Sequence, residues 1–216
     1  METVTLMMRL IKNAIPRTAR KSISKQMDRL GYDRRDWARI VLYQECERFI
    51  NEKIDRSHAR VLAVSSAFHF ENMGFSNFTA TTYPPFDICT DVLPGTYELI
   101  IADQVFEHLE NPEQAARNVY RMLAVGGWFL IATPFMLRIH PHPIDCYRWT
   151  ATGLVSLLSR VGFNKDDIET GQWGNRAWIT THMKDDESWP ARGFGSLRNE
   201  PKFPVVVWAF AYKRSS

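Results

Sequence analysis

The segment FMLRIHPHPIDCYRWT gathers side chains that can move protons or bind charged groups. The imidazoles of His140 and His142 titrate near neutral pH, so either could accept a proton from a reacting group. Arg138 and Arg148 could hold an acidic substrate. A structural alternative is that Asp145 pairs with Arg148, three residues further along the chain. The segment is therefore a candidate for proton transfer or anion binding.

The same segment offers residue types that ligate zinc or iron. They are spaced as His140-x-His142-x-x-Asp145, with Cys146 adjacent. The prolines beside both histidines keep the chain extended, so that the two rings could share a side. No second cluster in the sequence supplies further ligands. We therefore expect no metal site and keep a metal-dependent hydrolase as a minor alternative.

Three compact apolar runs precede polar residues, namely Arg60–Val64, Tyr97–Ala102 and Trp128–Thr133. Each has the length and composition of a buried strand. Ligands bind at the carboxyl ends of parallel strands, which meet at one edge of a sheet. We therefore expect three segments to form one site: the serine pair after the first run, the VFEH loop after the second and the histidine segment after the third.

Helical patterns separate these strands. Asn-Pro-Glu at 111–113 is a strong helix start, with a cap, a proline at the first helical position and an acid in the first turn. Another helix begins at Thr150 or Thr152 and stops at Gly162. Alternating strands and helices predict an α/β fold of the Rossmann-like, doubly wound type, with a mainly parallel sheet and helices on both faces.

The expected organisation is a basic helical N-terminal segment over residues 1–57, followed by an α/β domain over residues 58–216. Residues 1–29 hold seven basic and two acidic side chains, a balance of +5. Basic residues 9–29 could contact an anionic membrane surface, but a solvated helix is the interpretation we favour. Asp33 or Asp36 could cap the helix that follows.

The composition of the chain limits its expected partners, its expected compartment and its relation to a membrane. The net charge of +3 is too small to indicate nucleic acid as a partner. The three cysteines include no CxxC pair and fit a reducing cytoplasm. Apolar stretches are too short to span a bilayer. We expect a cytoplasmic protein, at most peripheral to the inner membrane face, and the sequence does not indicate its oligomeric state.

From Arg60 to Phe163 the chain resembles the class I S-adenosylmethionine-dependent methyltransferases with a type 11-like methyltransferase domain. The run DICTDVLPGTYELIIADQVFEHLENPEQAARNVYRMLAVGGWFLIATPF carries the resemblance through the order of its parts. The continuation HPIDCYRWTATGLVSLLSRVGF is similar to a segment of one branch of these enzymes. The resemblance implies seven strands with an antiparallel last strand, and S-adenosylmethionine as the cofactor.

The resemblance also assigns positions in a cofactor site. Asp87 matches the acid that faces the adenine amino group, and Ile88 beside it would cover the ring. Asp103, Gln104 and Val105 match the loop beside the methionine end of the cofactor.

The glycine-rich first motif of that family is degenerate in this chain. Ser65, Ala67 and His69 stand at the glycine positions, and Ala63 replaces an acid. A left-handed backbone at His69 would cost about 1 kcal/mol.

Hydroxyl side chains could bind the cofactor in place of the missing glycines and acid of this motif. Those of Ser65, Ser66 and Thr82 could bind the cofactor carboxylate or ribose. Ala67 is small enough to keep a close approach, and Tyr83 could stack on the adenine.

The expected activity is methyl transfer to an unidentified small-molecule or glycan-type acceptor, with His108, His140 and His142 as candidate catalytic residues. For Glu107 we expect a structural role, in which the carboxylate bonds a helix N-terminus or backbone amides. The alternative is a catalytically inactive binding or scaffold protein on a methyltransferase fold. It predicts a cofactor cleft filled by the aromatic stretch at 68–70.

Overall fold

The computed structural model describes residues 36–65, 68–183 and 198–215, and basic residues 9–29 lie outside that part of the chain. The elements in chain order are α3 (Trp37–Lys53), β1 (Arg60–Ala63), α4 (Phe68–Glu71), β2 (Asn77–Ala80), β3 (Tyr97–Asp103), η1 (Phe106–His108), α5 (Pro112–Met122), β4 (Leu123–Pro134), α6 (Ala151–Arg160), η2 (Lys165–Asp167), β5 (Ile168–Trp173), α7 (Arg176–His182) and β6 (Val206–Tyr212).

One sheet carries the fold, with strand order β2-β1-β3-β4-β6-β5. Strands β1 to β4 pair in parallel, and β6 runs antiparallel to both of its neighbours. The expected mainly parallel sheet with an antiparallel last strand is therefore confirmed. The described part of the chain has six strands where the resemblance implies seven. Between β2 and β3, residues 81–96 form turns and bends, because their prolines cannot donate hydrogen bonds to a strand ladder.

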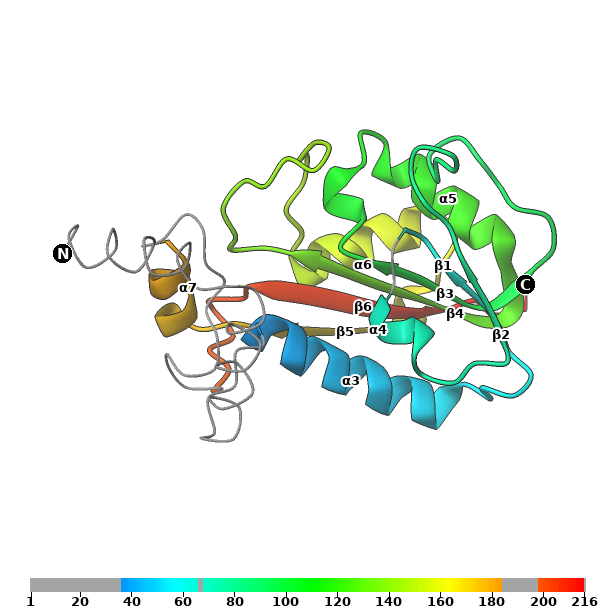
Figure 1. Ribbon diagram of the computed structural model, residues 1–216, viewed down its shortest axis with the longest axis horizontal. Coiled ribbons are helices and arrows are strands. Elements are labelled where there is room, and N and C mark those ends of the chain that lie inside the picture. The colour runs from blue at the N-terminus through cyan, green and yellow to red at the C-terminus, as the bar shows by residue number, and fades with distance from the viewer. Residues whose placement is uncertain (1–35, 66–67, 184–197, 216) are drawn as a thin grey trace, which may run out of the picture.

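The helices cover both faces of this sheet. Figure 1 shows α5 and α6 on one face and α3 on the other. Alternate residues of β3 enter different cores: Ile100 packs on the side of α5 and α6, whereas Leu99 and Ile101 pack on the side of α3. This alternation follows from the two-residue period of a strand, and it explains why the central strands are apolar throughout.

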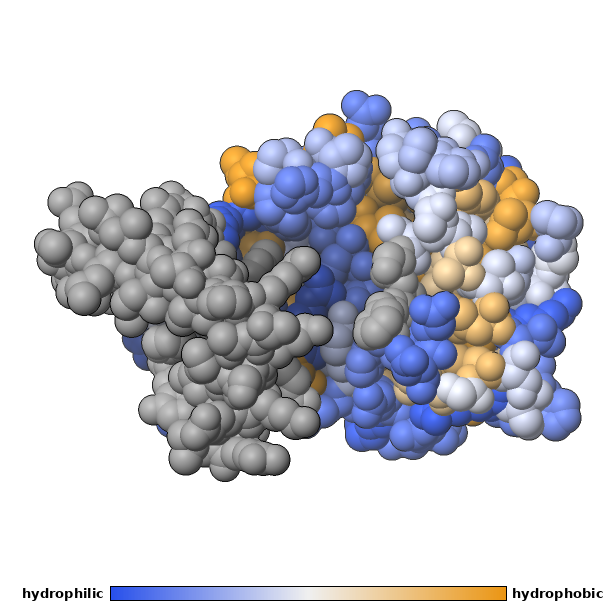
Figure 2. Space-filling view, viewed as in Figure 1, coloured by the Kyte–Doolittle hydropathy of each residue, from blue (hydrophilic) through white to orange (hydrophobic). Residues whose placement is uncertain are grey.

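Helix α3 docks firmly on the sheet. Asp36 caps it by accepting a hydrogen bond from the Ala38 N–H at 3.1 Å. Phe49 stacks on Phe210 with ring centroids 3.9 Å apart and meets the edge of Trp128. The outward face of α3 is hydrophilic (Figure 2). This helix therefore shares the core of the sheet, while the domain boundary at residues 57 and 58 stays a prediction.

Local sequence signals set the other helix ends. Asn111 accepts a hydrogen bond from the Gln114 N–H at 3.2 Å and caps α5, and Thr150 does the same for α6 with Gly153 at 3.0 Å. Strand β4 begins at Leu123, earlier than the apolar run predicts. Gly127 suits a tight position, because a Cβ atom there would lie 3.0 Å from the backbone carbonyl oxygens of Ala124 and Tyr97.

Candidate cofactor cavity and histidine cluster

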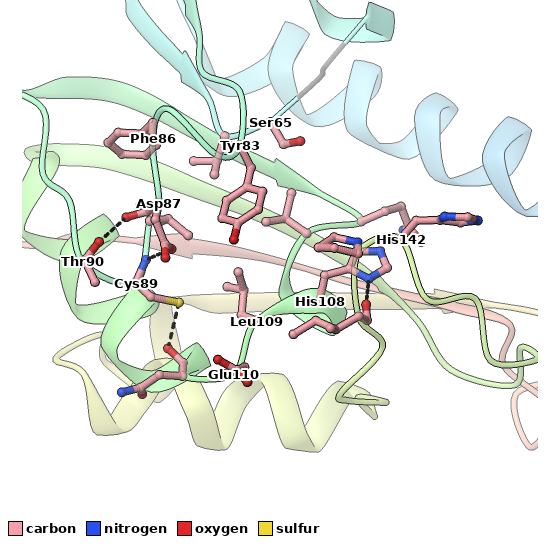
Figure 3. A pocket seen from close by; sticks show the side chains of 17 residues that line it. Ser65, Tyr83, Phe86, Asp87, Cys89, Thr90, His108, Leu109, Glu110 and His142 are labelled. Atoms are coloured by element: carbon pink, nitrogen blue, oxygen red, sulfur yellow. Dashed lines mark hydrogen bonds between the residues drawn. The ribbon is translucent and has the colours of Figure 1, made fainter.

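A cavity of about 310 Å³ opens at the carboxyl ends of β1 and β3. The strand order reverses between these two strands, which is where ligands bind in open α/β sheets. Figure 3 shows side chains from four loops pointing into it. The lining consists of Val64, Ser65, Tyr83, Phe86, Asp87, Ile88, Cys89, Thr90, Gln104, Val105, His108, Leu109, Glu110, Asn111, His142, Pro143 and Ile144.

The turn after β1 is formed by Ser65. Its φ of 67° lies in the left-handed region, and its N–H donates to Thr81 Oγ1 at 3.3 Å. The strained position that we expected at His69 is therefore wrong, since His69 lies within α4 and Ser65 takes the left-handed conformation. Ser66 and Ala67, also expected in this turn, lie outside the described residues.

The loop after β2 places Asp87 and Ile88 in the cavity lining. Asp87 Oδ1 accepts the Cys89 N–H at 2.9 Å, which closes a tight turn and leaves Oδ2 for another partner. The buried amide of Asn118 donates to the carbonyl oxygens of Ile88 and Cys89, and so ties this turn to α5. No sequence pattern indicated this role of Asn118.

Gln104 and Val105 border the cavity from the loop after β3. The Gln104 backbone has a φ of 56°, and its N–H donates to the Ala132 carbonyl at 2.8 Å. Its side-chain Nε2 is buried and has no hydrogen-bond partner among the described residues. An unpaired buried amide is costly, so this donor is suited to a ligand acceptor.

The preceding residue, Asp103, does not line the cavity. Its carboxylate accepts hydrogen bonds from Arg39 Nη1 at 3.0 Å and from the Tyr43 hydroxyl at 2.8 Å. Burial and the negative charge of Asp103 raise the pKa of Tyr43, so the phenol stays protonated and donates. Asp103 thus joins α3 to the loop that carries Gln104, and the cofactor contact expected for it has no counterpart in the lining.

Tyr83 lies in the middle of the cavity opening, between Asp87 and the histidines (Figure 3). Its side chain is 62% exposed, so the ring is accessible for stacking on a flat ligand. Thr82 is exposed and is absent from the lining. Phe86, Cys89 and Thr90 also line the cavity, and sequence reasoning missed all three because the resemblance assigned only Asp87 and Ile88 in this turn.

The three candidate catalytic histidines differ in whether they line the cavity. His108 and His142 line the cavity, whereas His140 does not. Figure 3 shows His108 and His142 together at the side opposite Asp87. His140 packs against His108 edge to face, with ring centroids 5.1 Å apart.

Glu107 lies beneath these rings with a fully buried side chain. Burial raises the pKa of Glu107 to about 8. Neither carboxylate oxygen has a hydrogen-bond partner among the described residues. The bond that we expected from this carboxylate to a helix N-terminus does not form among the described residues, and the one backbone group that lowers its pKa is the main chain of Glu107 itself.

The structural alternative for Asp145 is confirmed. Arg148 binds both carboxylate oxygens, with Nη2 to Oδ2 at 2.6 Å, and this pairing holds the pKa of Asp145 at about 2. The Arg148 guanidinium is thereby engaged by Asp145 in this structure. Within the described residues, the clustered groups that could hold a metal ion are Glu107, His108 and His140, a different set from the minor alternative of His140, His142 and Asp145.

The comparison with protein families gives one match. A model described as a methyltransferase domain matches residues 26–168. No protein of curated function matches the chain significantly. Within the described residues, no helix has both the length and the apolar character needed to cross a membrane.

Solved structures share the fold. Phosphoethanolamine N-methyltransferase 2 from Haemonchus contortus, bound to phosphomonomethylethanolamine and S-adenosylhomocysteine, has a TM-score of 0.51 and 13% identity, covering 80% of this chain and 53% of its own. The glycopeptide N-methyltransferase MtfA, bound to S-adenosylhomocysteine, has a TM-score of 0.50 and 13% identity. The match covers 78% of this chain and 88% of MtfA. A Listeria monocytogenes protein, provisionally described as an S-adenosylmethionine-dependent methyltransferase, has a TM-score of 0.50 and 12% identity. The match covers 78% of this chain and 97% of that protein.

Proposed function

Because the chain belongs to the methyltransferase-domain family, whose cofactor is S-adenosylmethionine, we propose that it methylates a small-molecule or glycan-type acceptor at the cavity between β1 and β3. The observation that carries the proposal is the cavity itself. It lies at the reversal of strand order and combines an unpaired buried donor, Gln104 Nε2, with a free acceptor, Asp87 Oδ2.

The polar groups present fit the cofactor despite the missing glycines. Asp87 Oδ2 would accept from the adenine amino group, and the apolar side chain of Ile88 would cover the ring. Gln104 Nε2 would donate to the carboxylate at the methionine end. Ser65 supplies the left-handed turn that glycine provides elsewhere in the family, so the backbone can still approach the ligand. Val105 and Tyr83 would enclose the remaining apolar surface.

S-adenosylmethionine supplies a methyl group on a sulfonium when it is bound. The chain must then position the acceptor and remove its proton where the acceptor is a hydroxyl or an amine. We assign proton removal to a ring nitrogen of His142, which lines the cavity and is exposed at its rim. His108 borders the same space, whereas His140 lies behind it.

The inactive alternative predicts a cofactor cleft filled by residues 68–70. His69 instead stacks on Tyr43 of α3, and Phe70 belongs to the core on that face. The open cavity therefore favours cofactor binding, while the acceptor class stays a proposal. The relatives named above act on a phosphoethanolamine compound and a glycopeptide, and each activity is stated of that protein alone.

Isothermal titration of the full chain with S-adenosylhomocysteine and S-adenosylmethionine tests the proposal. Replacing Asp87 by Asn should weaken binding about 10- to 100-fold, since a hydrogen bond to a charged group contributes about 1.5–3 kcal/mol. Gln104→Ala should also weaken binding. The matched control Asp166→Asn, at an exposed position in η2, should bind like the parent protein. Folded protein that binds neither ligand would instead support the scaffold alternative.

A further inference from the structure

Three hydrogen-bond acceptors converge beside the cavity. His108 Nε2 lies 3.6 Å from Glu107 Oε1, and His140 Nε2 lies 4.0 Å from the same oxygen. One ligand atom from each of the three residues lies within 4.8 Å of the others. Ligand atoms of a tetrahedral zinc stand about 3.3 Å apart, given bonds of about 2.0–2.1 Å, so small inward rotations of the side chains bring them into range.

The outer nitrogens of both rings are already engaged. His108 Nδ1 donates to the carbonyl oxygen of Ile144. His140 Nδ1 lies 3.3 Å from Asp145 Oδ2 and 3.3 Å from the Arg138 carbonyl oxygen. These partners accept a proton from Nδ1, which leaves the lone pair of each Nε2 facing Glu107. A carbonyl or carboxylate behind each imidazole is the usual support for a metal-ligating histidine.

Glu107 is the third residue of this cluster, beside His108 and His140. It has a fully buried side chain, and neither of its oxygens has a hydrogen-bond partner among the described residues. Two imidazole lone pairs and a buried carboxylate repel one another unless a positive charge lies between them. A single proton on Glu107 can be donated to only one of the two nitrogens. A divalent cation satisfies all three groups at once.

We propose that Glu107, His108 and His140 bind one divalent transition-metal ion, with Zn²⁺ as a fitting example, at the edge of the cavity. Two imidazoles and one carboxylate are a frequent ligand set for such ions and leave a coordination position open. Because His108 also lines the cavity, the ion would border the space that the acceptor must enter. This site goes beyond the proposed function.

The test measures metal binding without S-adenosylmethionine, so its failure is distinct from failure of the proposed function. The full chain, free of any affinity tag, is treated with a chelator, loaded with Zn²⁺, desalted and analysed for bound metal by mass spectrometry. Competition with a chromophoric chelator then gives the affinity. We expect one ion per chain, and a higher melting temperature for the loaded protein than for the chelator-treated protein.

Variants identify the ligands. Glu107→Gln and His140→Ala should each weaken Zn²⁺ binding at least about tenfold, because each removes a ligand. The matched controls Glu110→Gln, at an exposed position in the cavity lining, and His58→Ala, at an exposed remote position, should bind Zn²⁺ like the parent protein. Circular dichroism establishes that each variant is folded, and His108→Asn replaces any variant that is not.

Two results would overturn the site. The first is folded parent protein that retains no stoichiometric metal. The second is stoichiometric binding that survives both Glu107→Gln and His140→Ala, which would assign the ion to other side chains such as the exposed Cys146.

Discussion

Removing the carboxylate of Asp103 should destabilise the protein by about 3 kcal/mol. This side chain is 7% exposed and joins the loop after β3 to α3 through Arg39 and Tyr43. The hydrogen bond from the Tyr43 hydroxyl to the charged carboxylate, at 2.8 Å, contributes about 1.5–3 kcal/mol. Arg39 is 40% exposed, so solvent screens its ion pair, which adds about 1 kcal/mol or less.

Urea denaturation of the Asp103→Ala variant, followed by tryptophan fluorescence, measures this loss. The midpoint should fall with little change in slope, because the surface exposed on unfolding stays the same. The melting temperature should fall by about 6–12 °C, since about 1 kcal/mol corresponds to about 2–4 °C in a chain of this size. Arg48→Ala removes two exposed ion pairs on the same helix, with Glu45 and Glu52, and should leave the midpoint almost unchanged.

A double-mutant cycle isolates the contact. Tyr43→Phe removes only the hydroxyl, and its combination with Asp103→Ala should reveal a coupling free energy of about 1–2 kcal/mol. A loss below about 0.5 kcal/mol for Asp103→Ala, or additive effects in the cycle, would refute the assigned role of Asp103 as the anchor of α3.

Two further substitutions test how the elements that surround the site are held. Phe49→Ala should lower the free energy of unfolding by about 3–5 kcal/mol in urea denaturation, because it removes a buried ring stacked between α3 and β6. An effect below about 1 kcal/mol would mean that α3 does not depend on this contact. Asn111→Ala should cost about 1 kcal/mol in the same assay, since it leaves the first turn of α5 uncapped. Equal stability of Asn111→Ala and the parent would contradict the role of the cap.

Much of the fold was predictable because its signals are local. The caps at Asn111 and Thr150 act within three residues of their own position, so the sequence alone indicated where α5 begins and placed the start of α6 at Thr150 or Thr152. Compact apolar runs indicated the central strands, since a strand buried on both faces is apolar throughout. The resemblance implied seven strands, whereas the described residues form six, and residues 81–96 form turns and bends in place of a further strand.

The candidate site also has features that could be predicted from the sequence and features that could not. The resemblance implied cofactor-site positions for Asp87, Gln104 and Val105, and the structure places all three in the cavity lining. The roles of Asp103 and Glu107 did not follow, because each depends on side chains distant in sequence. Asp103 is engaged by Arg39, 64 residues away, and contacts at that separation arise only when α3 packs on the sheet.

The sequence by itself therefore predicted most of the strands and helices, the edge of the sheet where the cavity lies, and the loops that border it. Tertiary structure decided which polar groups remain available there. Arg148 pairs with Asp145, and Asp103 accepts hydrogen bonds from side chains of α3. By contrast, the side chains of Gln104 and Glu107 have buried polar atoms without hydrogen-bond partners among the described residues. The physical reason is that burial and pairing depend on neighbours brought together by folding, whereas caps and apolar runs depend on neighbours along the chain.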